Sequence, residues 1–367
     1  MKSSGIGGQA VLEGIMMRNG GKYAVAVRKP DKEIVIDVKN HQGMTDKHKF
    51  LNIPFVRGVF KFAESLSVGI KTLTYSASFF EDEEEDEKLK GKEEKKAAKK
   101  GAKSDTKKAS ENDLDKENRA EEFKESDSAD LEEQKKKAEE KAKKIEDIVM
   151  ALTVCFSVVL SVFLFIVLPF LASEFMKNVL SIKSVAIIAI VEGFMRIFIF
   201  LVYIVLISRM KDIQRTLMYH GAEHKCINCI EHGLPLTVEN VKKSSRIHKR
   251  CGTSFLLFVV VISIISFILV SAVLPAASKG WLKLVVRLLL IPLIAGISFE
   301  ILRKAGNSDG KIITAISKPG MWLQKLTTRE PEDDMIEVGI ASVEAVFDWK
   351  AYIKENFNVV VDDSKEA

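Results

Sequence analysis

The sequence contains 367 residues, of which 47% are hydrophobic and 29% are charged, and its formal net charge is +5. These averages are typical of a soluble protein of two domains. The uneven distribution of charged and apolar residues along the chain excludes a soluble protein. Almost nothing is apolar between Glu81 and Asp147, whereas Ile148–Leu171 carries no charge. We therefore predict a mostly α-helical, polytopic membrane protein whose general partner is the lipid bilayer, and we expect no nucleic-acid partner.

Residues 1–80 are expected to form a cytosolic or interfacial region. Its opening residues, MKSSGIGGQAVLEG, lack the long apolar core of a signal peptide. Tyr23–Val38 indicates two strands around a turn at Pro30–Asp31, which predicts a small β-hairpin. Phe55–Phe80 has a helical pattern that is apolar around most of its girth. Such a helix lies in the membrane interface or packs on other helices, and its four charges favour the interface.

Residues 81–147 form a charged segment that is rich in Lys, Glu, Asp, Ser and Ala. Such a composition cannot bury enough apolar surface to fold. We expect a disordered, solvated linker rather than a specific binding element. Its last part, LEEQKKKAEEKAKKIED, can form an exposed helix that runs into the first membrane span.

Four apolar segments are long enough to cross a bilayer, which requires about 20 residues. They are Ile148–Leu171, Ser184–Ser208, Phe255–Leu274 and Trp281–Leu302. The short connections Ser173–Lys183 and Pro275–Gly280 join them into two transmembrane hairpins, 148–208 and 254–303. The fold class is therefore about four transmembrane helices with a small N-terminal β-hairpin region and a C-terminal amphipathic helix.

Charged side chains inside the spans need partners, because an intramembrane charge is costly. Glu192 and Arg196 lie four residues apart on one face of the second span, and Arg287 enters the fourth span to a similar depth as Glu192. We predict that Glu192 pairs with Arg196, with Arg287, or with both. The alternative is that Arg287 extends to the interface and pairs with nothing.

Basic residues near the span ends predict the orientation. The segment between the second and third spans is rich in Lys and Arg, and Arg303, Lys304 and Lys311 follow the fourth span. Such residues mark the cytoplasmic side. We therefore predict a multi-pass protein of the cell membrane with both termini and the central segment in the cytosol. The reducing cytosol argues against disulfides among the four cysteines.

The central segment, 209–253, carries the strongest chemical signal of the sequence. YHGAEHKCINC places His220, Glu223 and His224 at the spacing H-x-x-E-H and puts a C-x-x-C pair directly behind. We expect the helix of the second span to continue through this stretch. The two histidines then share its packed face with the position of Glu231, and Cys226 and Cys229 point away.

The spacing of His220 and His224 lets both imidazoles reach one ion, while Glu223 acts on a bound water as general base. Two core histidines satisfied by polar neighbours are the structural alternative. A catalytic Zn²⁺ has three protein ligands and one open position. His248 and Cys251, in HKRCGTSF, offer the further ligands. Cys251 also precedes a helix amino end, which favours thiolate.

Two other uses of the cysteines are open. Cys226, Cys229, His248 and Cys251 could form a closed structural zinc site, which would leave His220 and His224 unexplained. A redox role for Cys226 and Cys229 lacks the expected flanking strand.

The C-terminal region, 304–367, contains the segment REPEDDMIEVGIASVEAVFDWKAYIKE. Its acidic start favours a helix amino end. Apolar residues follow on one face: Met335, Ile336, Ile340, Val343, Val346 and Phe347. We predict one amphipathic helix that packs against the cytosolic region.

Six stretches together resemble the bacterial YqhQ-type membrane protein family, a domain of unknown function whose label is a predicted metal-dependent enzyme. They are GGQAVLEGIMMR, RGVFKFAESLSVG, YHGAEHK, PLTVENV, HKRCGTSF and LTTREPEDDMIEV. The resemblance covers nearly the whole chain outside the charged linker. It implies a membrane enzyme whose site residues are His220, Glu223, His224, His248 and Cys251.

These observations lead to one functional hypothesis and one alternative. The first is a zinc-assisted hydrolase at the cytoplasmic membrane face. Glu223 is its catalytic residue, and the metal ligands are drawn from His220, His224, His248 and Cys251. An anionic lipid head group or a membrane-protein segment would be its substrate. The alternative is a non-enzymatic membrane scaffold whose zinc site is structural.

Overall fold

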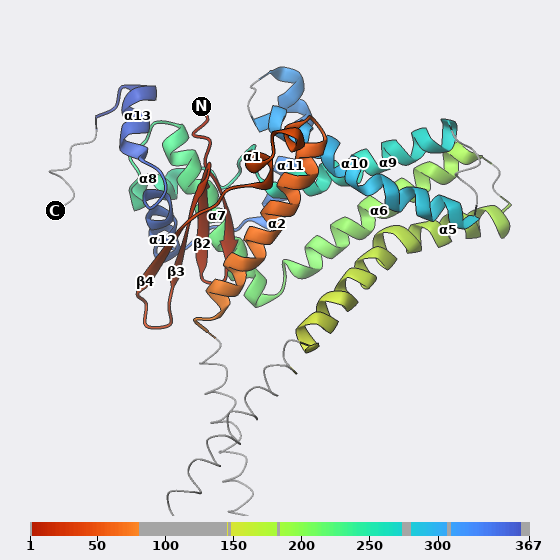
Figure 1. Cartoon of the computed structure of the whole chain (residues 1–367), viewed down its shortest axis with the longest axis horizontal. Coiled ribbons are helices and arrows are strands. Elements are labelled where there is room, and N and C mark those ends of the chain that lie inside the picture. Colours follow the sequence, from red (N-terminus) through yellow and green to blue (C-terminus); the bar gives the residue numbers. More distant parts are fainter. Residues whose placement is uncertain are drawn as a thin grey trace, which may run out of the picture. The chain divides into compact units, whose positions relative to one another are not determined.

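The computed structural model describes residues 2–80, 145, 148–181, 184–273, 280–306 and 310–360. It divides into two compact units, Met1–Glu84 with Pro169–Ala367, and Glu85–Leu168. The chain is mostly helical, as predicted, with a small antiparallel sheet near its amino terminus (Figure 1). Apart from Ile145, the linker predicted at 81–147 lies outside the described residues.

The sheet has four strands in the order β1-β2-β3-β4, all antiparallel. They are β1 Gly7–Val11, β2 Gly14–Asn19, β3 Lys22–Arg28 and β4 Ile34–Asn40. The β3–β4 hairpin confirms the predicted one, with Arg28 opposite Ile34. The first two strands were not predicted, although the Asn19-Gly20 pair is a hairpin turn signal and Gly20 has a positive φ of 56°.

Each face of the sheet packs on helices, because its side chains alternate. Ile15, Met17, Ala24 and Ala26 join a core with residues of α7 and α12, described below. Met16, Val25 and Val27 point to the other face and pack with Val68 of α2. The sheet therefore holds α7 on one side and α2 on the other.

Helix α2 (Val56–Ala77) confirms the helix predicted over Phe55–Phe80 and follows α1 (Met44–Lys47) and the 3₁₀ turn η1 (Lys49–Asn52). It packs on the helix of the fourth span, where Arg57 makes a bidentate pair with Glu300 at 2.6 Å. Leu66, Ile70 and Leu73 remain exposed. Of the two predicted locations, packing on other helices is therefore observed, although the membrane interface was favoured. The helix also keeps an apolar face that is exposed.

Four helices are apolar and long enough to cross a membrane, which confirms the predicted spans. They are Ile148–Asn178, with the π-helical turn η2 (Phe163–Val167) followed by α5 (Leu168–Asn178), α6 (Val185–Ile207), α9 (Gly252–Val273) and α10 (Gly280–Gly306). The predicted start of the connection between the first two spans, Ser173, was wrong. The helix continues to Asn178, and Ser173 is buried. Most of the second connection lies outside the described residues.

The predicted pairing inside the spans is confirmed with both partners. Glu192 accepts a hydrogen bond from Arg196 at 2.6 Å and another from Arg287. Lys283, which was not predicted to take part, also donates to Glu192 at 3.1 Å.

Helix α7 (Lys211–Glu231) does not continue α6, contrary to the prediction. The chain turns at Ser208–Met210, where the Arg329 guanidinium donates to the carbonyl of Ser208 at 3.0 Å and to the side chain of Gln214 at 3.0 Å. A side chain from far along the sequence therefore stabilises the break. The turn places α7 against the sheet (Figure 1).

The remaining helices are α8 (Val238–Lys243), α11 (Lys311–Thr327), α12 (Asp333–Glu344) and α13 (Trp349–Phe357). The single amphipathic helix predicted for the C-terminal region is therefore two, because Asp348 accepts from the backbone N–H of Ala351 and begins a new helix. The predicted packing is confirmed. Gly339 lets α12 approach α7 closely, since an added Cβ would lie 2.8 Å from the sulfur of Cys226.

Candidate metal centre

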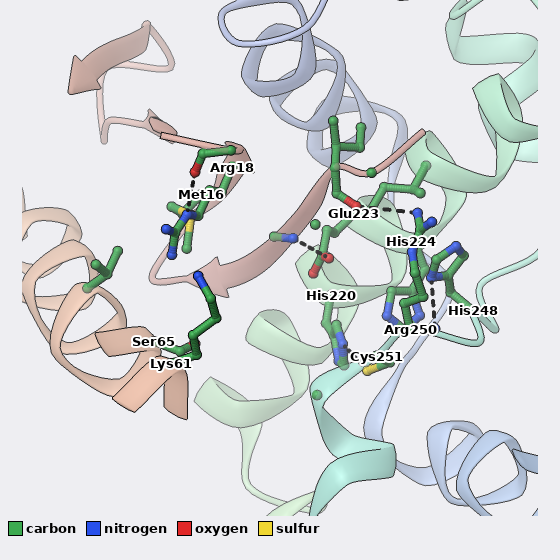
Figure 2. A pocket seen from close by; sticks show the side chains of 18 of the residues that line it. Met16, Arg18, Lys61, Ser65, His220, Glu223, His224, His248, Arg250 and Cys251 are labelled. Atoms are coloured by element: carbon green, nitrogen blue, oxygen red, sulfur yellow. Dashed lines mark hydrogen bonds between the residues drawn. The ribbon is translucent and has the colours of Figure 1, made fainter. Parts of the chain in front are cut away.

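The two histidines of the H-x-x-E-H stretch lie side by side on α7. Their ring centroids are 4.4 Å apart, with His224 only 1% exposed and His220 half-buried. The helix brings them together because residues four apart share one face. Both rings turn toward the same pocket (Figure 2).

Backbone carbonyls fix the orientation of both rings. Nδ1 of His220 lies 2.7 Å from the carbonyl of Thr327, and Nδ1 of His224 lies 2.7 Å from that of Arg246. A carbonyl only accepts, so Nδ1 carries the proton in each ring and Nε2 keeps its lone pair. Metal-binding histidines are held in this way, with the second nitrogen donating to a carbonyl or carboxylate.

Gly221 makes this orientation possible. A Cβ at this position would lie 2.0 Å from the carbonyl oxygen of Arg329. The backbone of Arg329 also donates to the carbonyl of Leu217 at 2.9 Å. The segment that supplies the Thr327 carbonyl can thus pack directly on α7 because a glycine stands between the two histidines.

Cys251 completes a group of three. Its sulfur lies 3.3 Å from Nε2 of His220, and the backbone N–H of Thr253, in the first turn of α9, donates to it at 3.4 Å. One ligand atom from each of His220, His224 and Cys251 lies within 4.8 Å of the others. Zinc bond lengths of about 2.0 Å to nitrogen and 2.3 Å to sulfur place tetrahedral ligand atoms roughly 3.5 Å apart. The three side chains therefore fit one ion with small adjustments.

Glu223 is buried beside this group and has one strong partner. Its Oε1 accepts from the backbone N–H of Gly8 in β1 at 3.1 Å. Burial raises the pKa of Glu223, although His220 and the hydrogen bond from Gly8 offset part of the effect. A raised pKa makes a carboxylate a better proton acceptor, which is what a general base requires.

His248, also predicted as a ligand, lies next to the group without belonging to it. Its ring centroid is 5.9 Å from that of His224. Nε2 of His248 donates to Glu231 at 3.2 Å, and Nδ1 accepts from the backbone of Arg250 at 3.3 Å. Burial lowers the pKa of His248, and the carboxylate of Glu231 opposes this effect. Both ring nitrogens are thus used inside the protein.

Glu231 returns to the histidine face of α7, as the helical spacing predicted, and is fully buried. It accepts from the backbone and the hydroxyl of Ser4 at 2.7 Å, from His248 and from Arg250. Burial alone would raise the pKa of Glu231, but His248, Arg250 and Ser4 outweigh it and hold the pKa at about 2. The carboxylate therefore stays charged and ties the amino terminus to the site.

Cys226 and Cys229 point away from the histidines, as predicted, and lie in the core between α7, α12 and the sheet. Burial raises the pKa of Cys226 well above its ordinary value and that of Cys229 to about 11. Among the described residues, the group of possible metal ligands includes Cys251 but neither Cys226 nor Cys229, so the closed zinc site is not formed. Their position is that of small core side chains.

The three side chains and Glu223 face a pocket of about 460 Å³ between α7, β1 and α2 (Figure 2). Arg18 of β2, Lys61 of α2 and Arg250 also line it. These cations were not predicted as site residues, because Arg18 and Lys61 come from a strand and a helix that are far from α7 in the sequence. A signal was present nonetheless, since GGQAVLEGIMMR and RGVFKFAESLSVG, two stretches behind the family resemblance, both contribute to the lining.

Comparison with known proteins assigns the family. The model of the family described as "Protein of unknown function (DUF1385)" matches residues 53–349. The chain belongs to the DUF1385 family. It is also 30% identical over 356 residues to "Uncharacterized protein YqhQ" of Bacillus subtilis (strain 168), an alignment that covers 95% of this chain and 94% of that protein. This supports the YqhQ-type resemblance seen in the sequence. No solved structure matches the chain.

Proposed function

We propose that this DUF1385 protein is a zinc-dependent hydrolase of the membrane surface, with His220, His224 and Cys251 as the metal ligands. One observation carries the proposal. Two carbonyls hold Nδ1 of both histidines, so that the Nε2 atoms and the sulfur of Cys251 converge beside a pocket. Three ligands and one open position are typical of catalytic rather than structural zinc.

A bound Zn²⁺ would polarise a water molecule and the bond to be cleaved. Glu223 takes the proton of the attacking water on its carboxylate and returns it to the leaving group. Gly8 holds the carboxylate through its N–H, and burial keeps its pKa raised for this exchange. His248 does not bind the metal in this proposal. It donates to Glu231 and so fixes the pocket wall beside His224.

The pocket favours an anionic lipid head group as substrate over a membrane-protein segment. Three cations, Arg18, Lys61 and Arg250, line the pocket beside Glu64 and Glu223. Arg18 pairs with Glu64 at 2.7 Å and Arg250 pairs with Glu231, and anionic lipids attract such cations. The same helix that supplies Lys61 exposes Leu66, Ile70 and Leu73. An apolar helix face of this type can lie in the membrane interface and bring the pocket to the head groups.

We place the pocket and both termini on the cytoplasmic side, following the basic residues near the span ends. Ser181 is exposed between α5 and α6 and therefore serves as a labelling position. A cysteine at Ser181 should react with an impermeant thiol reagent on intact cells. A cysteine at the exposed Lys243 of α8 should react only after the cells are opened. The opposite pattern would contradict this orientation.

Metal analysis tests the site. Protein purified without chelator and offered zinc should hold about one ion per chain, and His220→Ala should lose it. His232→Ala is the matched control, because His232 ends the same helix and is exposed. Absence of stoichiometric metal in the wild-type protein, or equal retention by His220→Ala, would refute the zinc site.

Glu223→Gln separates the enzyme from a scaffold with structural zinc. In an enzyme the variant keeps its zinc but no longer releases the soluble head group from vesicles of an anionic phospholipid. A scaffold would keep its zinc and its biological activity. The measurement is zinc content together with head-group release, with wild-type protein and His220→Ala as the two references.

A further inference from the structure

A second group of charges lies inside the spans, away from the pocket. Glu192 and Arg196 of α6 and Lys283 and Arg287 of α10 are each between 4% and 6% exposed. Glu192 is eight residues into its helix from Ser184, and Arg287 is seven from Gly280, which places both about 10–12 Å from the helix ends at 1.5 Å per residue. Glu192 and Arg287 are therefore within the apolar part of the spans, and Lys283 lies in the first turn of α10.

The charges of this group do not balance. Glu192 is the one carboxylate to which all three cations bond within the described residues. Arginine does not deprotonate in proteins, so Arg196 and Arg287 alone exceed Glu192 by one charge, and Lys283 adds to the excess. An unbalanced intramembrane charge marks a functional site.

The sequence around the group adds cations rather than acids. Between Pro169 and Arg196, and between Pro275 and Arg287, there are six basic residues and two acidic ones. One of the two acids, Glu174, pairs with Lys177 at 3.0 Å. The connections at this end of the spans, SIKS and PAASKG, contain lysine and no carboxylate. Among the residues that the structure describes, Glu192 is therefore the counter-charge of all three cations.

The guanidinium groups of Arg196 and Arg287 are fixed by contacts with Phe267 and Glu192. Both stack on the ring of Phe267, with their carbons 5.0 Å and 4.9 Å from its centroid. One N–H of each donates to Glu192, and a guanidinium has five such donors in a planar fork. Lys283 is fixed by Glu192 and by the hydroxyl of Ser173 at 2.9 Å.

We infer that Arg196, Lys283 and Arg287 form a binding site for a phosphate group at the end of the bundle remote from α7. Phosphate matches the chemistry because the arginine fork binds its oxygens in pairs. Either the head group of an anionic phospholipid or free phosphate could bring this group. This site is independent of the metal centre, so either can be refuted without the other.

Full-length protein in a phosphate-free maltoside detergent provides the test, with thermal unfolding as the measurement. One arm adds phosphatidylglycerol, with diacylglycerol of the same acyl chains as the control for the tails. The other arm adds inorganic phosphate, with chloride at equal ionic strength. A rise in melting temperature in the first arm alone identifies a lipid head group, and a rise with inorganic phosphate identifies the free anion. No rise in either arm overturns the site.

Variants connect the response to these residues. Arg287→Gln should weaken the response at least about tenfold in concentration, because a charge-assisted hydrogen bond is lost. Arg303→Gln, an exposed arginine at the other end of α10, is the matched control and should respond as the wild type does. Equal responses of Arg287→Gln and the wild type would overturn the site.

Two further variants decide the matter if Arg287→Gln does not fold. Arg287→Lys keeps the charge but loses the fork, so it should lose the preference for phosphate over chloride. Glu192→Gln removes the competing carboxylate and should strengthen the response, even if the starting melting temperature falls. A purely structural group of charges would show neither change, and that result would overturn the proposal.

Discussion

Two regions of α7 each contain a buried carboxylate, and the protein surrounds them differently. At the pocket, Glu223 accepts one hydrogen bond, from the backbone of Gly8, and burial raises its pKa. Two turns later, Glu231 accepts from Ser4, His248 and Arg250, and its pKa is held at about 2. Both side chains are buried, so the additional donors of Glu231 and the charge of Arg250 make the difference.

The contrast assigns different tasks to the two carboxylates. A buried carboxylate with a full set of donors stays charged and stabilises the fold, whereas one with few donors can take up a proton. Glu231 therefore fixes the wall of the pocket by holding the amino terminus and His248. Glu223, with its single donor, is the carboxylate that the proposed hydrolase would use as its base.

Glu231→Ala should have the largest effect on stability. The change leaves the charge of Arg250 and the donors of His248 and Ser4 without their acceptor, and breaking a buried pair costs about 3–5 kcal/mol. Glu239→Ala, at an exposed acid of α8, should change the free energy of unfolding by less than about 0.5 kcal/mol. Chemical denaturation in detergent measures both. A small loss for Glu231→Ala would mean that the network is not structural.

The pH dependence of stability should follow Glu231. Its folded pKa of about 2 lies below the unfolded value of roughly 4.3. The folded state therefore gains stability above the unfolded pKa and loses it as the pH falls through the folded pKa. The shift corresponds to about 3 kcal/mol, lost progressively below about pH 5.

Unfolding measured from pH 7 to pH 3 in wild-type protein and in Glu231→Gln checks this expectation. The variant starts lower and should lose less over this range, because it lacks the carboxylate. Parallel curves for the two proteins would show that other groups control acid unfolding.

Cys226 and Cys251 show the same contrast between a structural side chain and a proposed metal ligand. Cys226→Ser places a hydroxyl in the core beside Gly339, at a cost of about 1–3 kcal/mol. Cys251→Ser should instead lose zinc while its metal-free stability stays close to that of the metal-free wild type. Zinc content and unfolding of both variants test the pair. Loss of zinc from Cys226→Ser alone would reverse the assignment.

The sequence predicted the membrane helices and the histidine face of α7 because both depend on local spacing. It did not predict the break between α6 and α7, which has no glycine or proline and depends on Arg329 from a distant segment. The strands β1 and β2 were also missed. Glycine and methionine are frequent in them, and neither residue favours strands as β-branched side chains do.

The site itself was partly predictable for the same reason. His220, Glu223 and His224 stand in one motif, and Cys251 was predicted together with His248 as a further ligand from HKRCGTSF. The distinction between Cys251 and His248 required the fold, since both lie in HKRCGTSF and only the structure shows His248 donating to Glu231. Arg18 and Lys61 reach the pocket from a strand and a helix far from α7, and no spacing rule connects them with it.

Glu223→Gln should have a much smaller effect on stability than Glu231→Ala, although it should abolish the proposed hydrolysis. The raised pKa means that burial favours the neutral acid, and glutamine resembles that form in shape and charge. Its side-chain oxygen can still accept from Gly8. We expect a change of less than about 1 kcal/mol at neutral pH, within the range of substitutions that break no buried network.

The free energies of unfolding of Glu223→Gln and Glu231→Gln, measured in one experiment, test this expectation. The two changes are chemically identical and lie on the same helix. Glu231→Gln loses a charge that Arg250 and His248 require, whereas Glu223→Gln loses a charge that its surroundings disfavour. Equal destabilisation by the two variants would make Glu223 a structural residue. The proposed hydrolase would then lack a general base. The alternative, a scaffold with a structural zinc site, would be favoured.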